Sequence, residues 1–130
     1  MQFFILGPVN PEAQAALVRH GHSVHSDLEL SADTDAPASL EDSPSQLLEL
    51  LSHKGWNLLT TDTAFIRLMY EQKAEFPRGV VVHLLDDPAD LHDQAPAIDR
   101  LFKRYPRLTP KRLYTITPSR VKIRQLPGPP

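Results

Sequence analysis

The sequence predicts an α/β fold, a three-layer α/β/α sandwich on a mainly parallel sheet that ends in a C-terminal β-hairpin. Short apolar runs alternate with segments of helical spacing along most of the chain, and this alternation is typical of parallel sheets covered by helices. The runs at 3–6 and 79–85 are almost continuously apolar, as expected of strands buried on both faces. Residues 112–117 and 120–124 flank the turn Pro118-Ser119 and indicate an antiparallel pair.

The N-terminal segment predicts a strand, a helix and a second strand. The first strand is expected at 3–6. Asn10 has the side chain of an N-cap, and Pro11 suits the first position of the helix that follows. Gly21 is expected to end this helix, and residues 22–25 are expected to form the second strand.

A long polar and acidic segment without a clear period, residues 26–44, predicts a loop. The pattern Ser43-Pro44-Ser45-Gln46 has the form of a capping box and predicts the start of a Leu-rich helix that ends at Gly55. The strand at 56–60 follows and places Asp62 at its carboxyl end. In an α/β fold this edge of the sheet carries the ligand and metal sites.

The remaining elements follow the same rules. Apolar residues after Asp62 have helical spacing and predict a helix that ends before Pro77, and 79–85 predicts a buried strand. Asp86-Asp87-Pro88 then turns the chain into a helix that runs through Tyr105.

Length and composition bound the class of protein. A chain of 130 residues suits one domain, which we expect over residues 1–126, followed by a tail at 127–130. The absence of cysteine excludes disulfides, thiol nucleophiles and zinc sites built from cysteine. Gly7-Pro8 ends the first apolar run far short of a signal or membrane segment. We therefore expect a cytoplasmic protein with no membrane partner.

Charge is divided unevenly along the chain. Residues 1–99 carry five Lys or Arg and all sixteen Asp and Glu, whereas residues 100–130 carry nine Lys or Arg and no acid. In the last strand Arg120, Lys122 and Arg124 alternate with apolar residues, which predicts one strongly basic face. Two interpretations are open: a surface for a polyanion such as RNA, or a basic segment that packs against the acidic body or a second subunit.

Several short motifs occur in the order and spacing of one known family. They are the helix end Arg19-His20-Gly21-His22-Ser23-Val24, the Leu-rich helix that ends at Gly55, the strand end Leu59-Thr60-Thr61-Asp62 followed by Phe65, the strand Gly79-Val80-Val81-Val82, and the closing strand Arg120-Val121-Lys122-Ile123-Arg124. On these residues the chain resembles PIN-like domains, a small α/β nuclease fold common in bacterial toxin–antitoxin ribonucleases. The resemblance spans nearly the whole chain and is to the compact group of similar length.

The resemblance implies a chemistry as well as a fold. In PIN-like nucleases three or four carboxylates converge at the strand ends and hold one or two Mg²⁺ or Mn²⁺ ions, which activate water for phosphodiester cleavage. By this resemblance Asp62 would be a catalytic metal ligand, and Thr60 would orient Asp62 or a bound water.

The chain departs from that pattern at the other acidic positions. The turn from Gly7 to Asn10 has no acid, the helix before the central strand has Ser45-Gln46, and Ala64 stands two residues past Asp62. One carboxylate with neutral neighbours makes a weak site for a hard dication. We therefore expect weakened or lost nuclease activity. Capping or solvation explains each remaining acid more simply, but five of them could replace the missing ligands: Glu49 on the Leu-rich helix, Asp86 and Asp87 after the next strand, and Glu41 and Asp42 in the long loop.

Two functions without catalysis also fit the sequence. One is an interaction protein that forms a homodimer or binds a partner protein through the acidic loop and the basic hairpin. The other is a nucleic-acid-binding module that contacts RNA phosphates through the basic residues of the hairpin. These residues are Arg112, Arg120, Lys122 and Arg124.

Overall fold

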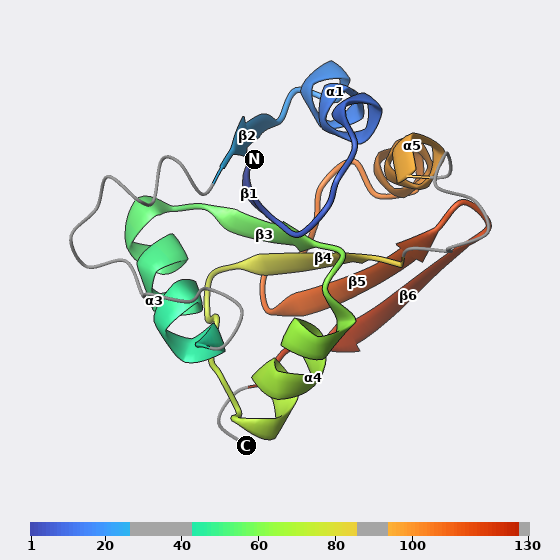
Figure 1. Cartoon of the computed structure of the whole chain (residues 1–130). Coiled ribbons are helices and arrows are strands. Elements are labelled where there is room, and N and C mark those ends of the chain that lie inside the picture. Colours follow the sequence, from blue (N-terminus) through green and yellow to red (C-terminus); the bar gives the residue numbers. More distant parts are fainter. Residues whose placement is uncertain (27–42, 86–93, 128–130) are drawn as a thin grey trace.

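The computed structural model describes residues 1–26, 43–85 and 94–127. Most of the expected loop at 26–44, with Glu41 and Asp42, and the candidate ligands Asp86 and Asp87 lie outside these ranges. The described elements are, in order, β1 (Gln2–Leu6), α1 (Pro11–Arg19), β2 (Ser23–His25), α3 (Pro44–Lys54), β3 (Asn57–Thr60), α4 (Thr63–Glu71), β4 (Val80–Leu84), α5 (Gln94–Arg104), β5 (Arg112–Thr117) and β6 (Arg120–Gln125) (Figure 1). Every strand and helix that the sequence predicts is present.

The strands form one sheet in the order β2-β1-β3-β4-β5-β6. Strands β1 to β5 pair in parallel, and β6 pairs with β5 in the antiparallel direction. The predicted mainly parallel sheet with a C-terminal hairpin is therefore confirmed. Because β2 lies on one side of β1 and β3 on the other, the topology switches direction between the carboxyl ends of β1 and β3. Open α/β sheets bind their ligands near such points.

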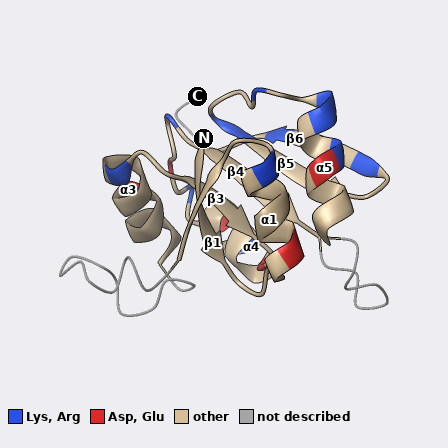
Figure 2. Cartoon of the chain, turned by 90° about the horizontal axis from the view of Figure 1, so that it is seen from above, with Lys and Arg blue, Asp and Glu red and all other residues tan. Residues whose placement is uncertain are grey.

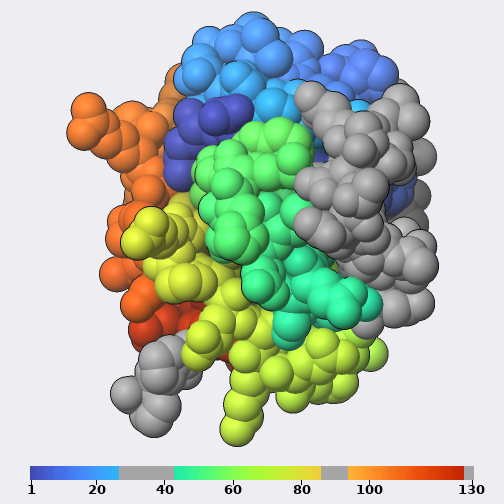
Figure 3. Space-filling view, turned by 90° about the vertical axis from the view of Figure 1, so that its left-hand side faces the viewer, coloured from blue at the N-terminus to red at the C-terminus, as the bar shows by residue number. Residues whose placement is uncertain are grey.

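Helices cover both faces of the sheet, an arrangement compatible with the expected three-layer sandwich (Figure 1). Helices α1 and α5 lie over a core that includes Phe3 and Tyr114. Helices α3 and α4 lie over a second core that includes Phe4, Leu58 and Val81, and α3 occupies the centre of the view in Figure 3. Because a strand alternates its side chains between two faces, consecutive apolar residues such as Phe3 and Phe4 fill separate cores.

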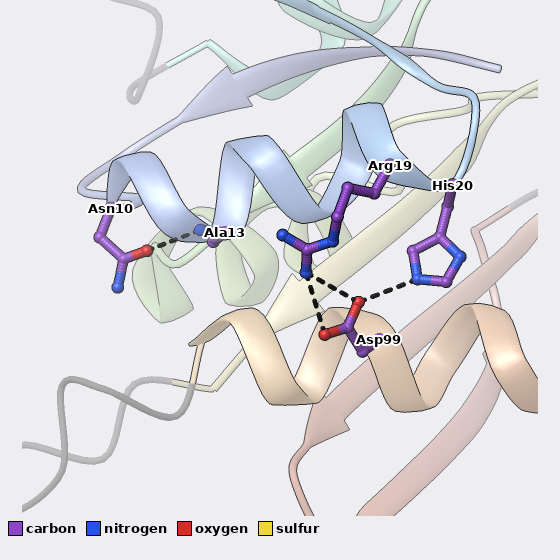
Figure 4. Close-up of polar contacts among 5 residues, drawn as sticks. All are labelled: Asn10, Ala13, Arg19, His20 and Asp99. Atoms are coloured by element: carbon purple, nitrogen blue, oxygen red, sulfur yellow. Dashed lines mark hydrogen bonds and ion pairs between the residues drawn. The ribbon is translucent and has the colours of Figure 1, made fainter.

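An ion pair joins the two helices of the first face (Figure 4). Asn10 begins α1, and its side-chain oxygen accepts the Ala13 N–H at 2.8 Å. At the other end of α1, Arg19 and His20 contact the Asp99 carboxylate of α5 at 3.1 and 2.9 Å. Burial alone would raise the pKa of Asp99, but the hydrogen bonds from His20 and Arg19 outweigh it and lower the pKa. Arg19 and His20 of the Arg-His-Gly-His motif therefore hold α1 against α5.

One local prediction is wrong. The side chain of Ser43 makes no capping hydrogen bond, so the capping box expected with Gln46 does not form. The Ser43 backbone, at φ −132° and ψ 67°, lies outside the extended conformation that aims an N-cap side chain at the first N–H groups. Helix α3 instead begins with Pro44 at its first position, and the Ser43 carbonyl accepts the Leu47 N–H at 3.0 Å.

Candidate functional site

Asp62 and Thr60 lie at the carboxyl end of β3, beside the topological switch point. Thr60 is fully buried, and its hydroxyl oxygen accepts the Asp62 N–H at 3.0 Å. The Asp62 carboxylate accepts the Phe65 N–H at 3.0 Å and so caps α4. A carboxylate is stabilised at a helix N-terminus by the exposed N–H groups and the helix dipole. Both side chains therefore have structural roles that require no metal.

A neutral side chain holds the turn after β1, where the resemblance implies the first acid. Gln94, at the start of α5, is buried. Its side-chain oxygen accepts the Asn10 N–H at 2.8 Å, and its side-chain nitrogen donates to the Pro8 carbonyl at 3.2 Å. Because both ends of the amide are engaged with the backbone, Gln94 stabilises this turn and adds no anionic ligand to the site.

The donor set around Asp62 does not fit the expected Mg²⁺ or Mn²⁺ centre. Within residues 1–26, 43–85 and 94–127, no group of three or more His, Asp or Glu is placed to hold a metal ion. Glu49 is exposed and lines a groove with Lys73 and Glu75, and Asp62 is not part of that groove. Asp86 lies outside the described residues. One capping carboxylate falls short of the roughly six oxygen ligands that such ions take.

A row of polar side chains crosses the sheet beside Asp62. The paired positions, one on each of four neighbouring strands, are Thr60 on β3, His83 on β4, Thr115 on β5 and Lys122 on β6. Side chains at paired positions point to the same face of a sheet, which here is the face of α3 and α4. Exposure increases along the row, from 0% at Thr60 and 5% at His83 to the exposed Lys122.

This row opens into a groove of about 600 Å³ between α4 and the β5–β6 hairpin. The polar groups that line it are the cations of Arg120, Lys122 and Arg124, the hydroxyls of Thr115, Thr117 and Ser119, and the His83 imidazole. No Asp or Glu is among the described lining residues. The Arg124 guanidinium also lies 3.9 Å from the ring of Tyr70 on α4, a cation–π contact that joins the hairpin to the helix. The described lining of the groove is therefore electropositive.

The groove contains three of the four basic residues expected to contact nucleic acid, and Arg112 lies elsewhere. Arg112 is two residues before Tyr114, whose side chain belongs to the core of α1 and α5, so the two share that face. Arg112 lines a second recess, which also includes Lys111 and shares Ile123 and Arg124 with the groove. Seen from above, basic segments lie on both α5 and the hairpin (Figure 2).

His83 is the candidate that the sequence reasoning missed, although one imidazole inside the apolar run 79–85 was a visible signal. Its Nε2 lies 3.3 Å from the Thr63 hydroxyl at the start of α4. Burial lowers the pKa of His83 below its ordinary value of 6.5, and the nearby Asp62 carboxylate opposes this shift without cancelling it. The imidazole is therefore neutral at pH 7 in the folded protein.

Replacing His83 by glutamine is expected to reduce the loss of stability on acidification. The unfolded chain binds a proton at His83 near pH 6.5, whereas the folded protein binds it only at lower pH. The contribution of His83 is thus complete above pH 6.5 and is lost as the pH falls through the folded pKa. Urea denaturation at several pH values measures how the free energy of unfolding changes with pH. His53→Gln, at an exposed histidine, is the control, and an equal effect of both variants would contradict the prediction.

Comparisons with known proteins identify no relative. No family model, no curated protein and no solved structure matches the chain. None of the helices in the described ranges is long and apolar enough to cross a membrane.

Proposed function

We propose that this chain is a cytoplasmic PIN-like protein that binds RNA in the groove beside α4 and has weak or no metal-dependent ribonuclease activity. The sequence motifs support the PIN-like assignment, and a mainly parallel β-sheet covered by helices on both faces agrees with it. The observation that carries RNA binding is the lining of the groove. Three cations and three hydroxyl groups gather there, with no acid among the described lining residues.

A phosphodiester backbone matches this lining. Lys and Arg side chains neutralise phosphates and release condensed counterions, which supplies most of the sequence-independent affinity for nucleic acid. Hydroxyl groups donate hydrogen bonds to phosphate oxygens and set the register of the strand. The volume of about 600 Å³ is also within the range of ligand pockets, about 300–1,000 Å³, so part of one strand can enter the groove.

The missing carboxylates account for weak or absent cleavage. Asp62 caps α4, and Gln94 holds the turn where the first acid of the PIN-like pattern would stand, so the described residues lack the charge that a catalytic dication requires. RNA incubated with Mg²⁺ or Mn²⁺ should therefore remain intact. Metal-dependent cleavage that disappears in Asp62→Asn would overturn this part of the proposal. Asparagine is as good an N-cap as aspartate, so this variant keeps α4.

Labelled single-stranded RNA is expected to bind with an affinity that falls with salt. Three phosphate contacts predict a slope of about −2 for log affinity against log salt concentration. Lys122→Glu should weaken binding about tenfold and flatten the slope by about 0.7 or more, because one contact becomes a repulsion. Fluorescence anisotropy at several salt concentrations measures both quantities.

Arg112→Glu is the matched control for this experiment, since it makes the same change of charge on the opposite face of the hairpin. It is expected to reduce the affinity for RNA much less than Lys122→Glu does. Equal losses in the two variants, or an affinity that does not depend on salt, would contradict the groove as the RNA site.

A further inference from the structure

The groove is closed at one end. His83 lies there with an exposure of 5%, and the next side chain of the same row, Thr60, is fully buried. Ile66 of α4, which is 7% exposed, also lines the groove. Toward the edge of the sheet the row ends at Lys122, which is exposed. A ligand that enters along the row from the β6 edge therefore meets a dead end where α4 covers the sheet.

The row that leads to this end offers an imidazole, a hydroxyl group and an ammonium group on successive strands, at His83, Thr115 and Lys122. Neighbouring strands lie about 4.8 Å apart, so one small anion can contact two adjacent members of the row. A phosphomonoester has three free oxygens and carries about −1.5 to −2 charge at pH 7. An internal phosphodiester has two free oxygens and a single negative charge. The terminal group is therefore the better match for a set of donors with no acid among the described lining residues.

We propose that the groove binds the terminal phosphate of an RNA strand, with Lys122 and Thr115 in contact with the phosphate. The inference rests on the proposed function, because it names the part of the RNA that the groove recognises. A terminal group fits a dead end, whereas an internal phosphate would require the strand to continue past it. Arg120 and Arg124 lie two residues from Lys122 on the same face of β6 and face the following phosphates as the strand leaves.

The test compares short RNA strands of one sequence that differ only at an end. One pair carries a 5′-phosphate or a 5′-hydroxyl and is labelled at the 3′ end, and the other pair carries a 3′-phosphate or a 3′-hydroxyl and is labelled at the 5′ end. The phosphate is expected to tighten binding about tenfold at one of the two ends, as a charge-assisted hydrogen bond does. The pair that shows the difference identifies which end is bound.

Two variants connect this preference to the groove. Lys122→Gln is expected to reduce the affinity for the phosphorylated strand to that for the hydroxyl strand. Arg112→Gln removes the same charge from the other face and is expected to keep the tenfold preference. Lys122 is exposed, so its substitution should leave the fold intact, which a thermal melt verifies for both variants. A preference that persists in Lys122→Gln would overturn the assignment to this groove.

The remaining outcomes separate this inference from the proposed function. Equal affinities for phosphorylated and unphosphorylated strands would overturn the terminal-phosphate site and leave RNA binding in place. Binding of a nucleoside monophosphate that Lys122→Gln removes, without any binding of RNA, would overturn the proposed function and retain the phosphate site.

Discussion

Replacing Gly79 by alanine is expected to lower the free energy of unfolding by about 3 kcal/mol, at the upper end of the usual range for overpacked interiors. Gly79 precedes β4, and a Cβ at this position would overlap the Phe76 ring at Cδ2, Cε2 and Cζ. The ring has little room to move, because Phe76 is 2% exposed within the core of α3 and α4. The backbone is also held, since the Gly79 N–H donates to the Phe76 carbonyl and the Gly79 carbonyl accepts the Lys111 N–H.

In urea denaturation this loss appears as a lower midpoint concentration of urea, while the dependence of the unfolding free energy on urea concentration stays unchanged. Gly21→Ala is the control, because a Cβ at Gly21 meets nothing within 4 Å and only its positive φ of 85° disfavours alanine, at about 1 kcal/mol. Combining Gly79→Ala with Phe76→Leu should cost less than the sum of the two single losses, since the smaller side chain relieves the overlap. A loss at Gly79 no larger than that at Gly21 would show that the Phe76 ring does not restrict this position.

Gly7→Ala is expected to lower the free energy of unfolding by about 2 kcal/mol, within the range for a residue forced to a disfavoured backbone conformation. Gly7 has a φ of +96°, and its Cβ would lie 2.5 Å from the Thr61 hydroxyl oxygen. The Thr61 N–H donates to the Leu6 carbonyl at 3.3 Å, so the segment after β3 cannot withdraw without loss of that bond. The strain falls at the topological switch point, directly before the Asp62 cap of α4.

Thr61→Ala separates the contact from the backbone strain. The Thr61 hydroxyl is buried and has no hydrogen-bond partner among the described residues, so its removal leaves no partner unpaired. In the Gly7→Ala background, Thr61→Ala should recover about 1 kcal/mol, and the remainder is the cost of the positive φ. Urea denaturation of the four proteins completes the cycle. Losses that simply add would show that the Thr61 side chain is not the source of the strain.

Residue types predicted the ends of helices well wherever a single side chain, or a single glycine, supplies the cap. Asn10 caps α1, and Gly55, at a φ of 72°, ends α3. The end of α4 was harder to place. Ala74 N–H bonds the Met69 carbonyl and Lys73 N–H bonds the Tyr70 carbonyl, the pair of a Schellman motif. Lys73 occupies the left-handed position at a φ of 52°, and no glycine marks the site in the sequence.

The strand pattern also predicted that Asp62 lies at the carboxyl end of a buried strand, and the structure places it there as the N-cap of α4. This prediction concerns residues next to one another in the chain. The capping box expected at Ser43 shows where a prediction from residue types and spacing fails. Ser43 and Gln46 have the required types and spacing, but the backbone at Ser43 does not aim the hydroxyl at the helix.

Local patterns established that β6 alternates basic and apolar side chains, that Asp62 follows a buried strand, and that the central run 79–85 contains one histidine. The tertiary structure decided which of these residues share a site. Strand register places His83 and Lys122, far apart in sequence, on one row, and side-chain parity places Arg112 on the opposite face. His83 lines a groove because it lies where the cover of the sheet by α4 ends. Register and coverage depend on contacts between distant segments, which no local pattern encodes.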